Sequence, residues 1–123
     1  MKRPRLSDMS TGDLVELFVK CAIAQDNALF ANAVGEVNKL YWNIDAIKNE
    51  LQSREGDQRR ALLPLYRHPN PQVKLKAAKA TFALAPGAAR QVLETLANTC
   101  VGPQKLEAGM CLFNLDEGIF KPK

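Results

Sequence analysis

The residues whose types could support catalysis or metal binding are few, and they are scattered along the chain. The single histidine, His68, stands beside Pro69, where a turn is expected, and no glycine-rich phosphate loop or serine elbow accompanies it. Cys21, Cys100 and Cys111 lie in apolar stretches without C-x-x-C spacing. Such cysteines are typical of buried thiols in a reducing compartment. We therefore expect neither a metal site nor a cofactor.

The adjacent carboxylates Asp116 and Glu117 are the nearest approach to an acid–base pair. Neighbouring residues on a helix point about 100° apart, so these two cannot flank one scissile bond. Since no nucleophile, base or metal array stands elsewhere in the sequence, we predict that the protein is not an enzyme. Binding is then the expected class of function.

A basic segment, residues 54–79, is the most uneven charge feature. The whole chain has a formal net charge of +4, and this segment holds seven Lys/Arg but only two acidic residues, Glu55 and Asp57. Six of its cations are predicted to contact a partner: Arg59, Arg60, Arg67, Lys74, Lys76 and Lys79. Three of these, the lysines, also fan across a helix face as on an ordinary solvated surface.

Two aromatic neighbours, Tyr41 and Trp42, are further candidates for binding. Tyr41 falls on the apolar stripe of a predicted helix, so we expect it in the core. Trp42 falls off that stripe. It is either an exposed contact anchor or is covered by a neighbouring helix or by the tail.

Helical periodicity runs through the chain, and no alternating β pattern occurs. Ser10, with Asp13 three residues later, predicts the start of a first helix that ends near Ala28. A second helix is predicted from near Asn32 to Ser53, with Gly56 as its C-cap. Residues 1–9 are expected to form a flexible tail, and residues 10–120 a single helical domain.

Polar caps or prolines then begin a short helix about every 13–17 residues. The predicted starts are Asp57, Asn70–Pro71, Pro86–Gly87 and Gly102–Pro103. The last of these helices carries Leu106, Met110 and Phe113 on one face. Pro71 and Pro103 are 32 residues apart, a period typical of repeated helix pairs. We predict an all-α fold, a short right-handed stack of antiparallel helix pairs with about six helices. An ordinary helix bundle would share this periodicity, although the short connections favour the stack.

The run from Leu62 to Ala78 resembles a HEAT repeat. It holds Leu-Leu-Pro-Leu, a tight turn, a valine followed by a lysine, and an Ala-Ala pair; HEAT repeats usually carry aspartate where His68 stands. From about Leu14 to Gly118 the chain is similar to a bacterial domain-of-unknown-function family with HEAT-like repeats. The resembling stretches are Asp57–Leu63, His68–Ala80 and Ala108–Met110 with Leu112. The resemblance implies a HEAT-like α-α superhelix and supplies no catalytic residues. Some small bacterial HEAT-like proteins are suspected toxin-immunity proteins.

Two functions are open at this point. The first is a cytoplasmic, non-catalytic protein-interaction module of the immunity or adaptor kind, whose basic segment faces an acidic partner. The alternative is a nucleic-acid-binding protein that uses the basic segment 54–79 against phosphates. No apolar run approaches the roughly 20 residues of a membrane span, so we expect no membrane partner. We also expect no secretory signal, because acidic residues interrupt the region after the basic N-terminus.

Overall fold

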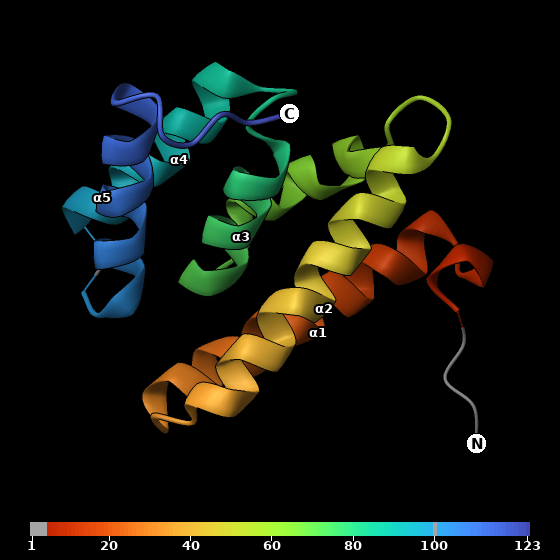
Figure 1. Ribbon diagram of the computed structural model, residues 1–123, viewed down its shortest axis with the longest axis horizontal. Helices are drawn as coiled ribbons and strands as arrows, with labels where there is room; N and C mark the ends of the chain where they lie inside the picture. The colour runs from red at the N-terminus through yellow and green to blue at the C-terminus, as the bar shows by residue number, and fades with distance from the viewer. Residues whose placement is uncertain (1–4, 100) are drawn as a thin grey trace. The chain divides into compact units, whose positions relative to one another are not determined.

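The computed structural model describes residues 5–99 and 101–123, and within these residues every regular element is a helix (Figure 1). Five are α-helices and two are 3-10 helices (η). In chain order they are η1 (Leu6–Asp8), α1 (Thr11–Phe30), α2 (Val34–Ser53), η2 (Gln58–Arg67), α3 (Pro71–Thr81), α4 (Pro86–Thr99) and α5 (Pro103–Asp116). The predicted all-α fold is confirmed. None of the described helices is long and apolar enough to cross a bilayer.

The chain divides into two compact units, Met1–Ala61 and Leu62–Lys123. The first unit contains the long helices α1 and α2, which lie side by side (Figure 1). The second contains the shorter helices α3, α4 and α5, and η2 leads into it. Adjacent helices pack against each other in both units, as expected for paired helices. Cys100, which the sequence predicts to be a buried thiol, lies outside the described residues.

The turn between α1 and α2 is set by Asn32. Its φ of 57° is in the left-handed region, which asparagine tolerates better than most residues. The N–H of Ala33 donates to the Ala28 carbonyl at 2.8 Å, and that of Asn32 donates to the Leu29 carbonyl at 3.1 Å. These bonds close α1 in a Schellman motif. The prediction that α2 starts near Asn32 is corrected, because Asn32 terminates α1 and α2 begins at Val34.

The outer ends of α1 and α2 are fixed by local bonds. Ser10 caps α1 as predicted, since its hydroxyl accepts from the Asp13 N–H at 3.0 Å. The C-cap of α2 is Arg54, and Gly56 lies two residues beyond it with a φ of 78°. The predicted C-cap at Gly56 is therefore wrong, because the backbone turns extended at Arg54 before it reaches the glycine.

Arg54 also binds the segment that was expected to be a flexible tail. Its guanidinium donates to the carbonyl of Leu6 at 3.0 Å and to the carbonyl of Met9 at 2.6 Å. It pairs with Glu50 at 2.9 Å one turn earlier in α2. One side chain thus links the end of α2 to η1 and to the start of α1.

The segment after Asp57 is a 3-10 helix, although the sequence predicted an ordinary helix there. Pro64 stands inside it. Proline has no N–H to donate, and its ring clashes with the carbonyl four residues earlier, which disfavours the α-helical pattern. The Tyr66 hydroxyl at the end of η2 hydrogen-bonds to the Thr81 hydroxyl at the end of α3. Thr81 itself donates to the Ala77 carbonyl at 2.7 Å, so η2 is bonded to α3.

In the second unit, α3 begins as predicted. Asn70 caps it by accepting from the N–H groups of Gln72 at 2.8 Å and Val73 at 3.3 Å, with Pro71 in the first turn. The fully or nearly buried core residues of α3, α4 and α5 are Leu75, Ala78, Ala89, Leu93, Leu96, Ala108 and Cys111. Four alanine or cysteine side chains among these seven let the helices approach closely. In this core α4 packs against both α3 and α5.

Polar side chains set the register of α3 against α5. The buried amide of Gln104 donates to the buried amide of Gln72 at 2.9 Å, and Lys76 donates to Glu107 at 3.0 Å one turn further along both helices. Both pairs join residues 31 or 32 positions apart. α3 and α5 therefore run in the same direction, as do corresponding helices of successive repeats.

Candidate interaction surfaces

Arg59, the first of the predicted contact cations, is engaged inside the first unit. Its side chain is only 4% exposed and forms two bonds with Asp57, Nε to Oδ1 at 2.8 Å and Nη2 to Oδ2 at 2.6 Å. The bond from the arginine side chain lowers the pKa of Asp57, so this carboxylate stays charged at neutral pH. Arg59 holds the turn before η2, and its charge is compensated there.

Lys76 and Lys79 are engaged inside the second unit. Both ammonium groups donate to one oxygen of Glu107, at 3.0 Å and 3.2 Å. Burial lowers the pKa of Lys76, which is 7% exposed, and the Glu107 carboxylate offsets only part of that effect. Burial alone would raise the pKa of Glu107, but the two ammonium charges outweigh it and lower that pKa. The expected solvated face of lysines is thus partly an internal ion-pair network.

The other predicted cations stay on the surface. Arg60 and Arg67 are exposed and Lys74 is half-buried, and none of them forms an ion pair among the described residues. Arg59 and Arg60 belong to the first unit, whereas the other four belong to the second. Neither unit on its own presents the six cations as one surface.

Trp42 is exposed, and Tyr41 beside it is exposed as well. Their exposed fractions are 66% and 46%, and the rings meet edge to face with centroids 5.2 Å apart. The placement of Tyr41 in the core is therefore wrong. The buried stripe of α2 consists of Leu40, Ile44, Ile47 and Leu51. Tyr41 lies about 100° around the helix from Leu40, just outside that stripe.

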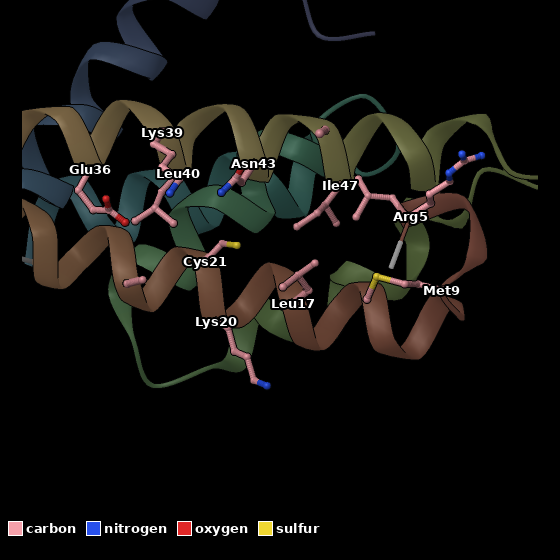
Figure 2. A pocket seen from close by; sticks show the side chains of 13 residues that line it. Arg5, Met9, Leu17, Lys20, Cys21, Glu36, Lys39, Leu40, Asn43 and Ile47 are labelled. Carbon is pink, nitrogen blue, oxygen red and sulfur yellow. The ribbon is translucent and has the colours of Figure 1, made fainter. Parts of the chain in front are cut away.

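The first unit has a groove of about 760 Å³ between α1 and α2 (Figure 2). Its floor is apolar and is lined by Leu17, Cys21, Ala24, Leu40 and Ile47. Figure 2 shows Leu17 across from Ile47, and Cys21 pointing into the space between the two helices. Small side chains on both helices leave this space open. They are the one feature of the sequence that could have indicated the groove, and the sequence analysis did not predict it.

The margin of the groove is mostly basic. Arg5, Lys20 and Lys39 line it and are exposed, whereas Glu36 is the one acidic residue of its lining. Figure 2 shows Lys20 extending outward from α1 and Arg5 at the end of the groove nearest Met9. An apolar floor beside cationic side chains suits an amphipathic ligand that carries negative charge.

The second unit exposes an apolar face on α5. Leu106, Met110 and Phe113 share one face, as their spacing predicted, and they are 70%, 63% and 60% exposed. Together with Ala97 and Gly109 they line a shallow hollow of about 530 Å³. Exposed apolar groups this close together are typical of binding surfaces.

Catalytic groups do not converge on any of these surfaces. The Nδ1 atom of His68 accepts a hydrogen bond of 3.0 Å from the Asn70 N–H, so His68 stabilises the turn before α3. Burial raises the pKa of the Cys111 thiol, which keeps it protonated and unreactive. Among the described residues, no three His, Cys, Asp or Glu side chains gather where they could hold a metal.

The described residues thus form a small all-helical protein with a groove in its first unit and an exposed apolar helix face in its second. The chain is a member of the family described as "Domain of unknown function (DUF2019)", which matches residues 12–116. It is similar to the structure described as the protein RPA1889 from Rhodopseudomonas palustris CGA009. The two are 48% identical, with 98% of this chain and 100% of that chain covered and a TM-score of 0.92. None of the curated proteins compared with this chain matches it.

Proposed function

We propose that the protein is a non-catalytic protein-interaction module of HEAT-like type, acting as an immunity or adaptor protein. The groove between α1 and α2 carries this proposal. Its volume is about 760 Å³, it lies between two long helices, and its floor is apolar whereas its margin is mostly basic. We propose that it receives an amphipathic helix of the partner, with acidic residues along both flanks of that helix.

The size of the groove fits a helical ligand. Along α2 its lining extends from Glu36 to Ile47, which corresponds to roughly 17 Å or about three helical turns. A partner helix lying in such a groove would place apolar anchors at i, i+3 or i+4 and i+7 on the floor. Acidic residues beside those anchors would meet Lys20 and Lys39 on opposite margins.

The HEAT-like assignment rests on the second unit. The proline-containing helix η2, the tight turn at Asn70 and the small-residue helix α3 follow the order of a HEAT repeat. The offset of 32 residues between Gln72 and Gln104 fits two successive repeats. We also propose a cytoplasmic location, which the buried cysteines Cys21 and Cys111 support, because neither forms a disulfide.

A capture experiment with groove variants tests the proposal. The tagged wild-type chain and the variant K20E/K39E would be used to capture proteins from the native cell, and bound proteins identified by mass spectrometry. The variant K121E/K123E changes net charge by the same amount at residues that do not line the groove, and it is the matched control. We expect a partner that the control retains and K20E/K39E loses, with an acidic amphipathic helix in its sequence. A partner retained by all three proteins would refute the groove as the binding site.

The nucleic-acid alternative has weaker support, because Arg59, Lys76 and Lys79 are already paired with carboxylates. It predicts binding to generic duplex DNA that weakens steeply with salt. A titration at low and at physiological salt, read by fluorescence anisotropy, separates the two functions. Salt-sensitive binding that is lost in R60E/R67E would favour the alternative over the groove.

A further inference from the structure

A short segment before α1 forms one end of the groove in the first unit. Arg5, Leu6 and Met9 all line the groove, and each lies in η1 or directly beside it. Figure 2 shows Arg5 and Met9 at the same end of the groove, beyond Leu17. The groove therefore has a third wall besides α1 and α2. We call residues 5–9 the end segment.

The 3-10 conformation of the end segment turns two apolar side chains to the same side. Leu6 and Met9 are three residues apart, and side chains at that spacing eclipse one another in a 3-10 helix. The Met9 N–H donates to the Leu6 carbonyl at 3.1 Å, which closes the turn. Both side chains are half-buried and line the groove, whereas Ser7 and Asp8 between them are exposed. The end segment thus presents its apolar side to the groove and its polar side to solvent.

Arg54 holds the end segment in this position, although it does not line the groove itself. Its guanidinium donates to the carbonyls of Leu6 at 3.0 Å and Met9 at 2.6 Å, the two residues whose side chains complete the wall. It also donates to the Thr11 hydroxyl in the first turn of α1 at 3.4 Å, and its ion pair with Glu50 at 2.9 Å ties it to α2. A helix of three residues has no stability of its own, so its position depends on such charge-assisted bonds.

We propose that Arg54 is a positioning residue of the groove, because it holds the end segment as a preformed wall against which one end of the bound helix packs. This inference rests on the proposed function and adds a contact and a residue to it. The apolar anchor nearest that end of the partner helix contacts Leu6 and Met9. The unbranched thioether of Met9 adapts its shape to that anchor. Since the wall exists before binding, the partner does not have to order it, and this raises the affinity.

Binding of a synthetic peptide tests this role. The probe is an acidic amphipathic peptide of about 14 residues, long enough to span the groove, with leucines at i, i+4 and i+7 and glutamates on both flanks. Amide chemical shifts of the isotope-labelled protein locate the bound peptide, and their titration gives the Kd. In the wild type we expect shifts at Leu17, Ile47 and Met9. R54A should bind the peptide roughly tenfold more weakly and should lose the shift at Met9.

Two variants of the second unit control for effects that do not involve the end segment. R90A removes one positive charge, as R54A does, and also breaks ion pairs, those with Glu94 and Asp116. E107Q breaks the pair with Lys76 and should lower the stability of the protein to a similar degree as R54A. Both should bind the peptide as tightly as the wild type does. If either weakens binding as much as R54A does, loss of charge or of stability explains the result and the positioning role is refuted.

A double-mutant cycle shows whether Arg54 acts through the end segment. L6A/M9A keeps Arg54 but removes the apolar side chains of the wall, and it should weaken binding roughly tenfold. Adding R54A to L6A/M9A should weaken binding by no more than about a further twofold. Fully additive effects, or wild-type affinity in R54A, would overturn the positioning role and leave the groove standing.

The groove itself is tested separately with the same peptide. K20E/K39E should weaken binding while the end segment stays in place. A wild-type chain that does not bind the peptide, or a K20E/K39E variant that binds it equally well, would refute the proposed function and this inference with it. The two proposals therefore fail in distinguishable ways.

Discussion

The Lys76 ammonium nitrogen lies 3.0 Å from Oε2 of Glu107, and the two residues occupy corresponding positions of α3 and α5. Lys74–Ala78 has the pattern Lys-Leu-Xaa-Ala-Xaa, and Lys105–Gly109 repeats it 31 residues later. The central position is lysine in the first copy and glutamate in the second. Opposite charges at this one position of two similar turns thus produce the ion pair that joins the two helices.

Removing the negative charge of this pair should destabilise the protein. E107Q removes the carboxylate that is paired with the buried Lys76 ammonium, and we expect a loss of about 1–3 kcal/mol in the free energy of unfolding. This loss is smaller than that expected for breaking a fully buried ion pair, because the Glu107 side chain is 35% exposed. The measurement is urea denaturation followed by circular dichroism.

Two variants make that result interpretable. E94Q breaks the surface pair of Arg90 and Glu94 and should change the unfolding midpoint little. K76M added to E107Q removes the buried ammonium as well, so the double variant should regain part of the loss. A loss in E107Q no larger than that in E94Q would contradict a structural role for the Lys76–Glu107 pair.

The same carboxylate should make stability depend on pH in acid. The folded-state pKa of Glu107 is lowered from its ordinary value of 4.5. The associated stability is therefore fully present above that value, and it is lost as the pH falls through the folded-state pKa. Asp57, whose pKa is also lowered, acts in the same direction. Unfolding free energies measured between about pH 6 and about pH 3 should fall less steeply in E107Q than in the wild type. Parallel curves would refute this origin of the acid sensitivity.

Arg54 should control the order of the segment before α1. R54A removes the bonds to the carbonyls of Leu6 and Met9 and the ion pair with Glu50. We expect a loss of about 1–2 kcal/mol in unfolding free energy and faster amide exchange in η1. R54K should rescue little, because one ammonium cannot reproduce the planar fork of a guanidinium. Unchanged exchange at Met9 in R54A would show that another contact holds this segment.

Trp42 is the single tryptophan of the chain, so its fluorescence reports on this site alone. Its exposure of 66% predicts red-shifted emission and efficient quenching by acrylamide. The fully denatured chain provides the reference for complete exposure. Blue-shifted, protected emission in dilute solution would mean that the ring is covered, and emission that shifts only at high concentration would indicate burial in an assembly.

The sequence by itself determined the helices and most of their starts. Ser10, Asn70, Pro71 and Pro103 mark helix starts because a cap or a proline acts on backbone groups within about four residues, and such interactions are encoded locally. The same local logic identified Leu106, Met110 and Phe113 as one face. It misplaced the start of α2 because the left-handed conformation of Asn32 depends on how α1 ends.

Only the tertiary structure decided which side chains are buried, paired or available. Lys76 looked like a solvated cation until α5 placed Glu107 beside it, 31 residues away. Tyr41 looked like a core residue, but the direction in which α1 packs on α2 left it outside the buried stripe. The groove likewise exists because small side chains of two separate helices line the same space. Burial and charge pairing arise between segments far apart in the chain, so periodicity within one segment cannot specify them.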